Sequence, residues 1–170
     1  EVRDLETAEI AVQSSLTGHL VLSTLHTNSA VGSITRLQDM GIEPFLLSSS
    51  LLGLLAQRLV RVLCDNCKIA YAPDEAERKL LGITSDIPPT LYHANGCEEC
   101  DQLGYSGRTG IYELIVFDEV MRNMVHSGVS ESELATEARK SGGSIRDDGR
   151  RNILSGRTTG EEVLRVTGEE

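Results

Sequence analysis

Aromatic side chains are scarce in this sequence, which has no tryptophan, two phenylalanines and four tyrosines among 170 residues. Its core must therefore be built mainly from Leu, Val and Ile. Basic residues are also outnumbered, since 16 Lys and Arg stand against 26 Asp and Glu and give a net charge of −10 at pH 7. Such a charge repels a phosphate backbone unless basic residues gather on one face, so we expect no nucleic-acid partner.

Targeting and membrane-spanning signals are weak as well. The first residues are charged and lack the basic, then apolar, pattern of a signal peptide, which favours a cytoplasmic protein. The longest apolar stretch, residues 45–63, is interrupted by three serines and by Arg58 and Arg61. Because charged side chains are costly inside a bilayer, we predict a buried helix of a water-soluble protein here, running up to the first cysteine pair.

The remaining composition is that of a folded globular chain. Hydrophobic residues make up 39% and charged residues 25%, which indicates one ordinary domain or two small ones with a real core. A phosphate-binding loop of the form G-x-x-x-x-G-K-[ST] is missing from the sequence.

The first 41 residues show the alternating helices and strand that are typical of an α/β fold. Apolar spacing predicts a helix over residues 6–17, ended by Gly18, and a strand buried on both faces over residues 19–25. A second helix follows up to Gly41, with Asn28 or Ser29 as its N-cap. Helix, buried strand and helix in this order favour a sheet with helices packed on it.

The second half is predicted to be largely helical. A short helix opens at Pro73 and Asp74, an apolar strand covers residues 111–117, and four short helical blocks follow. Ser130 begins a capping box, and Thr158 or Thr159 opens the last helix. We divide the chain into three segments, which are an α/β piece at 1–63, a cysteine-bounded insertion at 64–107 and a returning strand with a helical tail at 108–170.

All four cysteines of the chain fall into two C-x-x-C pairs, Cys64 with Cys67 and Cys97 with Cys100. Each pair can present two thiolates from one tight turn, and two such turns complete the tetrahedral set that zinc prefers. A closed four-thiolate site leaves no open position, so we predict a structural zinc ion. Two alternatives remain, namely thiols without metal, or two disulfides, which would require an oxidising compartment.

Two histidines bracket the predicted strand, His19 at its start and His26 at its end. The carboxyl end of a strand next to a helix N-terminus is where open α/β sheets bind ligands, so His26 is a candidate to donate a hydrogen bond to a phosphate oxygen. Both imidazoles could instead bond only to nearby loop or helix groups. Glu1 is a carboxylate that could orient water or hydrated magnesium beside a nucleotide.

Several longer stretches carry a resemblance to a known family. They are EVRDLETAEIAVQSSLTGHLVLSTLHTNSAVGSITRLQDMGI, LLAQRLVRVLCDNC, GCEECDQLGYSGRTGIYELIVFDEVMR and SIRDDGRRNILSGRTTGEEVLRVT. Together they cover most of the chain and resemble the type II secretion ATPases and the type IV pilus assembly ATPases of the secretion ATPase superfamily. The first stretch resembles the end of a Walker B motif followed by the family's His box.

The resemblance implies a fold, cofactors and partners. It implies the C-terminal half of a RecA-like P-loop core, with a tetracysteine zinc subdomain inserted and a helical C-terminal subdomain. Members are cytoplasmic homo-hexamers that hydrolyse ATP with Mg at the inner membrane, which they reach through secretion or pilus platform proteins.

By motif match, individual residues acquire expected roles. Glu1 would be the Walker B glutamate, His26 and His19 the His-box residues, and Cys64, Cys67, Cys97 and Cys100 the zinc ligands. Arg3 and Arg58 are weaker candidates for contacts to nucleotide or a neighbouring subunit. Because the family's Walker A loop and Asp box do not occur in these 170 residues, we expect this chain as given neither to bind ATP tightly nor to hydrolyse it.

Two other functions fit parts of the sequence. The chain could be a non-enzymatic zinc-ribbon adaptor that binds a protein partner through its helical tail. A nucleic-acid-binding ribbon has only the cluster at residues 146–151, RDDGRR, in its support, and two aspartates interrupt it.

Overall fold

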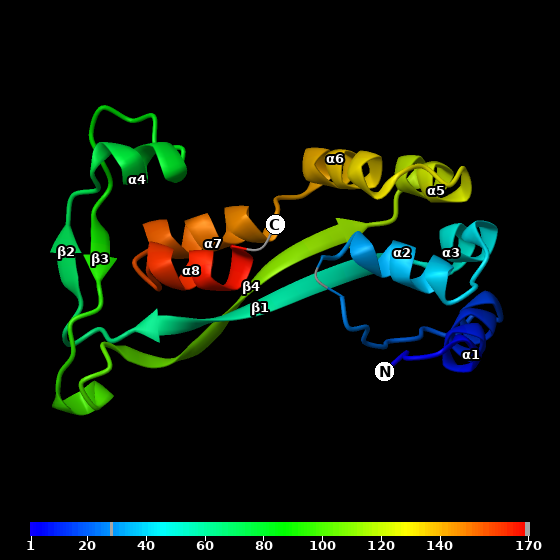
Figure 1. The fold of residues 1–170 in the computed structure, drawn as a ribbon, viewed down its shortest axis with the longest axis horizontal. Helices are drawn as coiled ribbons and strands as arrows, with labels where there is room; N and C mark the ends of the chain where they lie inside the picture. Colours follow the sequence, from blue (N-terminus) through cyan, green and yellow to red (C-terminus); the bar gives the residue numbers. More distant parts are fainter. Residues whose placement is uncertain (28, 169–170) are drawn as a thin grey trace. The chain divides into compact units, whose positions relative to one another are not determined.

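The structure is a computed structural model that describes residues 1–27 and 29–168. The chain forms two compact units, the first comprising residues 1–56 and 113–143 and the second residues 57–112 and 144–170. Two long strands, β1 (Gly53–Leu63) and β4 (Tyr105–Val116), pair with each other and contribute to both units (Figure 1). This compact division does not test the three segments proposed from the sequence, which remain a prediction.

The first unit is mostly helical. Its helices are α1 (Leu5–Leu16), α2 (Gly32–Asp39), α3 (Pro44–Ser50), α5 (Glu119–His126) and α6 (Glu131–Ser141). Their apolar faces share one core in which Ile34, Leu47 and Val125 are at most 1% exposed. Aliphatic side chains thus form most of this core, as the scarcity of aromatic residues predicts.

Side-chain caps begin α1 and α6 in this unit, and the one at Ser130 was predicted. Asp4 caps α1 by accepting from the Thr7 N–H, and Ser130 forms the predicted capping box at α6. Of the two N-caps predicted for the second helix, Asn28 lies outside the described residues and Ser29 is wrong, because the N-cap of α2 is Val31 and has no side-chain cap. The Ser29 hydroxyl does accept a hydrogen bond from the Gly32 N–H at 2.9 Å, just before the helix. The predicted helices near residues 6–17 and 30–41 are confirmed.

The buried strand predicted over residues 19–25 is wrong for this structure. The segment has no regular secondary structure, and Leu20 and Leu22 are 74% and 86% exposed. A strand requires neighbours that take its N–H and C=O groups. Here the Val2 N–H donates to the Thr24 C=O at 2.9 Å, but no described strand pairs with the segment.

The single helix predicted over residues 45–63 is also wrong. Helix α3 ends at Ser50, and β1 begins at Gly53 with exposed and less exposed residues alternating along it up to Val60. That period of two, from Leu54 to Leu59, is the pattern of a strand with one covered face. No helix among residues 1–27 and 29–168 is long and apolar enough to cross a membrane.

The second unit combines the long strands with smaller elements. These are β2 (Ile69–Tyr71), α4 (Glu75–Leu80), β3 (Leu91–His93), the 3₁₀ turn η1 (Glu98–Cys100), α7 (Ile145–Leu154) and α8 (Gly160–Thr167). Strands β2 and β3 pair antiparallel, with Ala70 opposite Tyr92. Val60 and Ile111, both fully buried, join α7 and α8 in a second core.

Candidate metal centre and nucleotide-site residues

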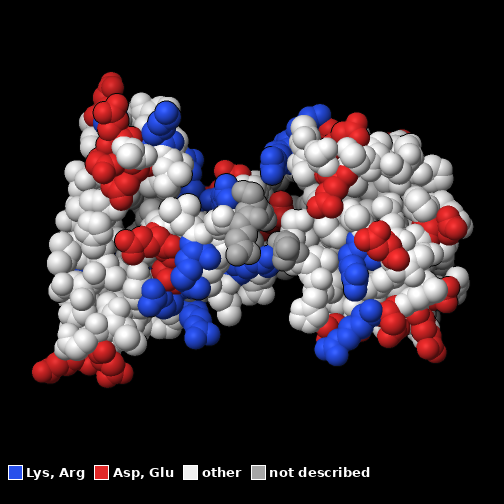
Figure 2. Space-filling view, viewed as in Figure 1, with Lys and Arg blue, Asp and Glu red and all other residues white. Residues whose placement is uncertain are grey.

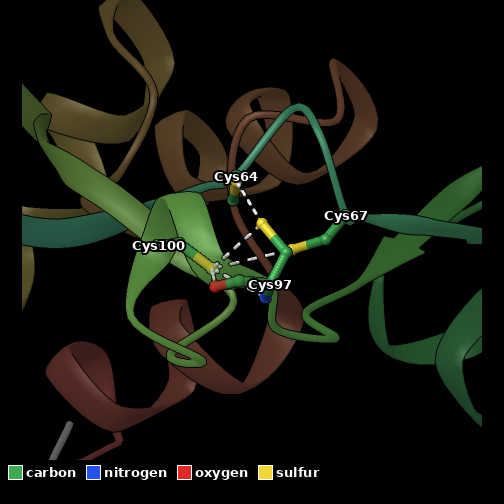
Figure 3. A group of neighbouring side chains, drawn as sticks. All are labelled: Cys64, Cys67, Cys97 and Cys100. Atoms are coloured by element: carbon green, nitrogen blue, oxygen red, sulfur yellow. Dashed lines mark hydrogen bonds between the residues drawn. The ribbon is translucent and has the colours of Figure 1, made fainter.

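The four cysteines meet at the base of the β2–β3 hairpin. Cys64 follows β1 directly and Cys67 closes the next turn, while Cys97 precedes η1 and Cys100 is its last residue. Figure 3 shows the two pairs projecting toward each other from their separate loops, and all four Sγ atoms lie within 4.8 Å of one another. The two C-x-x-C turns thus come together as the spacing predicts.

The distances between the sulfurs fit a four-thiolate metal site. The Sγ atoms of Cys64 and Cys97 lie 3.9 Å apart, those of Cys67 and Cys100 3.8 Å, and those of Cys97 and Cys100 3.7 Å. A tetrahedron with zinc–sulfur bonds of about 2.3 Å has edges of about 3.8 Å. A disulfide would need about 2.05 Å, and all four cysteines are free, so the disulfide alternative does not fit.

Backbone N–H groups surround the sulfurs and favour negative charge on them. Gly96 donates to the Cys67 Sγ at 3.3 Å, and both Cys97 and Gly104 donate to the Cys100 Sγ, at 3.3 and 3.2 Å. Burial opposes ionisation of Cys100, but these donors outweigh it and lower its pKa to about 7. Burial raises the pKa of Cys97 to about 11, as does its hydrogen bond with Cys100. Metal binding would therefore displace a proton held within the cluster.

Two glycines shape the second cysteine turn. Gly96 and Gly104 have positive φ values of 117° and 75°. A Cβ on Gly104 would lie 2.8 Å from the Ala94 Cβ, and one on Gly96 would lie 2.8 Å from the Gln102 carbonyl oxygen. Both positions thus need glycine for conformation and for space, which keeps the N–H donors directed at sulfur.

Glu1 and His26 lie together in the first unit. The His26 Nε2 is 2.8 Å from one carboxylate oxygen of Glu1, and the Arg3 guanidinium donates to the other at 2.6 Å. The hydrogen bond from Arg3 lowers the pKa of Glu1, and the charges of Arg3 and His26 act in the same direction. The Glu1 carboxylate is therefore ionised at neutral pH, and it is oriented by the Arg3 guanidinium and the His26 imidazole.

The other candidates occupy separate places. His19 Nδ1 is 3.2 Å from the Thr17 hydroxyl at the end of α1, which agrees with the alternative that this imidazole bonds only to nearby helix groups. Arg58 lies on β1, where its guanidinium donates to the Gln57 C=O at 3.2 Å. The structure therefore joins Glu1, His26 and Arg3, while the roles assigned to all five residues remain predictions.

The arginines of the basic cluster at residues 146–151 form hydrogen bonds and an ion pair within the second unit. Arg146 donates to the Thr167 C=O at 2.7 Å, Arg151 pairs with Asp148 at 2.7 Å, and Arg150 donates to the Leu81 C=O. The bonds of Arg146 and Arg150 connect α7 to α8 and to the end of α4, whereas the Arg151–Asp148 pair lies within α7.

One charged group of this unit was missed from the sequence. Glu162 on α8 is 1% exposed and binds Arg61 at 2.6 Å and Arg165 at 2.9 Å. The three-residue spacing of Glu162 and Arg165 on a helix was the available signal. Nothing in the sequence pattern pointed to Arg61, which is 101 residues away.

Comparison with known proteins assigns this arrangement to a family. The family model described as "Type II/IV secretion system protein" matches residues 1–165. The chain belongs to the type II/IV secretion system protein family. The resemblance read from the sequence motifs is thereby confirmed, and with it the assignment to type II secretion and type IV pilus relatives.

Curated relatives of this secretion-family chain are similar over its whole length. It is 71% identical over 170 residues to type II secretion system protein E of Pseudomonas aeruginosa and 57% identical over 169 residues to type II secretion system ATPase E of Vibrio cholerae. It is also 48% identical to type IV pilus assembly ATPase TfpB of Acinetobacter baylyi. The chain spans about a third of these relatives, 34%, 34% and 29% of their lengths.

Solved structures support the fold. The pilus retraction motor PilT with bound ADP matches 98% of this chain and 37% of its own, with a TM-score of 0.66 at 23% identity. The ATPase DotB of Legionella pneumophila matches all of this chain and 37% of its own, also with a TM-score of 0.66, at 18% identity. The mixed α/β fold class is thus supported at this level.

Proposed function

We propose that this chain is part of a secretion ATPase in which Glu1 and His26 belong to the nucleotide site. The observation that carries the proposal is the 2.8 Å contact between the His26 Nε2 and the Glu1 carboxylate, in a chain whose relatives include proteins named ATPases. The complete protein would be a cytoplasmic homo-hexamer. It would convert ATP hydrolysis into pseudopilus or pilus assembly and meet the inner membrane through platform proteins.

The chemistry follows from an ionised carboxylate beside an imidazole. In this proposal Glu1 orients the water that attacks the terminal phosphate, and Mg²⁺ balances the phosphate charge when nucleotide is bound. His26 is the phosphate sensor, because its side chain is 87% exposed and its Nε2 can exchange Glu1 for a phosphate oxygen. His19 belongs to the same His box. Arg3 restrains Glu1, and Arg58 serves a subunit contact.

The remainder of the protein would complete the α/β core. We assign to it the phosphate-binding loop and the strands that pair with residues 19–25, a segment that ends at the proposed phosphate sensor. The exposure of Leu20 and Leu22 supports this assignment, since burying two leucines contributes roughly 3–6 kcal/mol. This would restore the buried strand expected from the sequence and the C-terminal half of a RecA-like core.

The cysteine centre would hold a structural zinc ion. Its four thiols match the tetrahedral geometry and fill every coordination position, so the ion would fix the loops at the base of the β2–β3 hairpin and take no part in hydrolysis.

ATP turnover by the complete protein tests the nucleotide-site proposal. Glu1→Gln should lower turnover by roughly a hundredfold or more, because it removes the charge that orients water. His26→Ala should lower it by about tenfold to a hundredfold, with unchanged thermal unfolding. His126→Ala, at the exposed end of α5, is the matched control and should leave turnover unchanged. Full turnover in both Glu1→Gln and His26→Ala would reject the roles proposed for these two residues, and absence of turnover in the unaltered complete protein would favour the non-enzymatic adaptor.

A further inference from the structure

Three arginines of the second unit line one cavity. Arg61 on β1, Arg108 on β4 and Arg165 on α8 surround a volume of about 560 Å³, with Leu59 as the remaining lining residue. Figure 2 shows basic side chains gathered over the part of this face where β1, β4 and α8 lie. Such a concentration of positive charge is unusual in a chain with a net charge of −10.

Two of the three guanidinium groups are held in place by one buried carboxylate. Glu162 accepts from the Arg61 guanidinium at 2.6 Å and the Arg61 N–H at 3.0 Å, and it binds Arg165 through both oxygens at 3.0 and 2.9 Å. The Arg61 guanidinium also lies 4.0 Å from the centre of the Tyr105 ring. These contacts fix both groups beside the cavity, so a ligand would not have to order them.

Arg108 completes the cluster without a partner of its own. Its side chain is exposed and has no hydrogen bond or ion pair with any residue in 1–27 or 29–168. Because Glu162 compensates only one of the three charges, the cavity keeps an excess of two positive charges. Like charges held this close repel one another, and a bound anion would remove that repulsion.

We propose that this cavity binds a phosphate group. A phosphate monoester carries about −1.5 to −2 charges and three acceptor oxygens, which match the excess charge and the planar donor forks of arginine. A single carboxylate would neutralise only half of the excess. The phosphate belongs either to a soluble phosphate compound or to the headgroup of an acidic phospholipid, and the chemistry of the site is the same for both.

The test uses the complete protein with its nucleotide site saturated by a non-hydrolysable ATP analogue and magnesium. Pyrophosphate binding is measured by calorimetry, and vesicles of phosphatidylglycerol are compared with vesicles of phosphatidylcholine by co-sedimentation. Arg108→Ala should weaken binding by roughly tenfold and Arg108→Glu by more, with thermal unfolding unchanged. Arg139→Ala, an exposed arginine on α6, is the control and should bind as the unaltered protein does.

Each outcome decides the proposal. Pyrophosphate binding without vesicle binding, lost in Arg108→Glu, supports a soluble phosphate ligand. Retention on phosphatidylglycerol alone, also lost in Arg108→Glu, supports a headgroup. No binding of either probe, or equal binding by Arg108→Glu, overturns it. ATP turnover is not the readout, so failure here leaves the proposed roles of Glu1 and His26 untouched.

Discussion

The cysteine centre and the Glu1–His26 pair differ in how much of each site this chain supplies. The centre has four sulfur atoms from two loops and N–H donors at 3.2–3.3 Å that orient them. In the Glu1–His26 pair, His26 follows an irregular segment in which Leu22 is 86% exposed, and the His26 side chain itself is 87% exposed. We therefore expect the proposed metal site to be self-contained and the proposed nucleotide site to depend on residues outside this chain.

The largest expected effect is loss of the metal ligands. Replacing Cys97 and Cys100 by Ser should abolish zinc binding and destabilise the second unit by on the order of 5 kcal/mol, because metal binding contributes to folding. A strong chelator should have the same effect on the unaltered protein. Elemental analysis and thermal unfolding provide the measurement. Asn66→Ala, between Cys64 and Cys67, is the control, and unchanged unfolding of the double variant would contradict the prediction.

The next effect concerns Glu162, which secures α8 to β1. Hydrogen bonds from Arg165 overcome burial and, with those from Arg61, lower the pKa of Glu162 from 4.5 to about 2. A lowered carboxyl pKa adds stability above about pH 4.5 that is lost as the pH falls toward 2. Glu162→Gln should therefore cost about 2–3 kcal/mol at pH 7, and this difference should shrink at pH 3.

Urea unfolding of both proteins at the two pH values measures that difference, and comparing them cancels any effect of zinc release. Glu161→Gln, the exposed neighbour, should change stability by less than about 0.5 kcal/mol. A cost for Glu162→Gln that is equal at pH 7 and pH 3 would show that the carboxylate charge is not responsible.

Two glycines allow the effect of backbone conformation to be separated from the effect of space at the second cysteine turn. Gly104 and Gly107 have nearly equal φ values of 75° and 76°, but a Cβ would meet the Ala94 Cβ at 2.8 Å only at Gly104. Gly107→Ala should cost about 1 kcal/mol for its backbone conformation. Gly104→Ala should cost about 2 kcal/mol or more and also weaken zinc affinity. Equal costs, measured by urea unfolding, would show that space at the turn is unimportant.

The smallest effect in the isolated chain is expected for Leu22→Ser. With 86% of this residue exposed, the substitution should change the stability of the 170-residue chain by less than about 0.5 kcal/mol. In the complete protein, where we propose that the segment is buried, it should cost about 2 kcal/mol. Thermal unfolding of the two proteins gives the comparison, and equal changes in both would contradict the proposed burial.

Local signals in the sequence predicted much of the fold. The cap at Ser130, the stop at Gly41 and the C-x-x-C pairs all depend on neighbouring residues, and each is found as expected. The helix predicted over residues 45–63 is wrong because a mostly apolar run fits either a helix or a strand, whereas the alternation from Leu54 to Leu59 favours the strand. Contacts between distant residues, such as Arg61 with Glu162, leave no local pattern and could not be predicted.

In the candidate sites, too, features that depend on neighbouring residues were predicted and contacts between distant residues were not. Family motifs singled out Glu1 and His26 individually, but their contact across 25 positions was not predicted, and neither was the irregular path of residues 19–25. That path depends on which neighbouring strands are present, and a pattern read within the segment itself carries no information about them.

The most direct test of the comparison is a pair of measurements on one preparation of the reduced 170-residue chain. Elemental analysis should find about one zinc ion per chain. An ATP turnover assay should find no turnover that depends on Glu1, so the unaltered chain and Glu1→Gln should give the same result. That result would support a self-contained metal centre and a proposed nucleotide site that this chain does not complete. Turnover that disappears in Glu1→Gln, or well under one zinc ion per chain, would contradict the account.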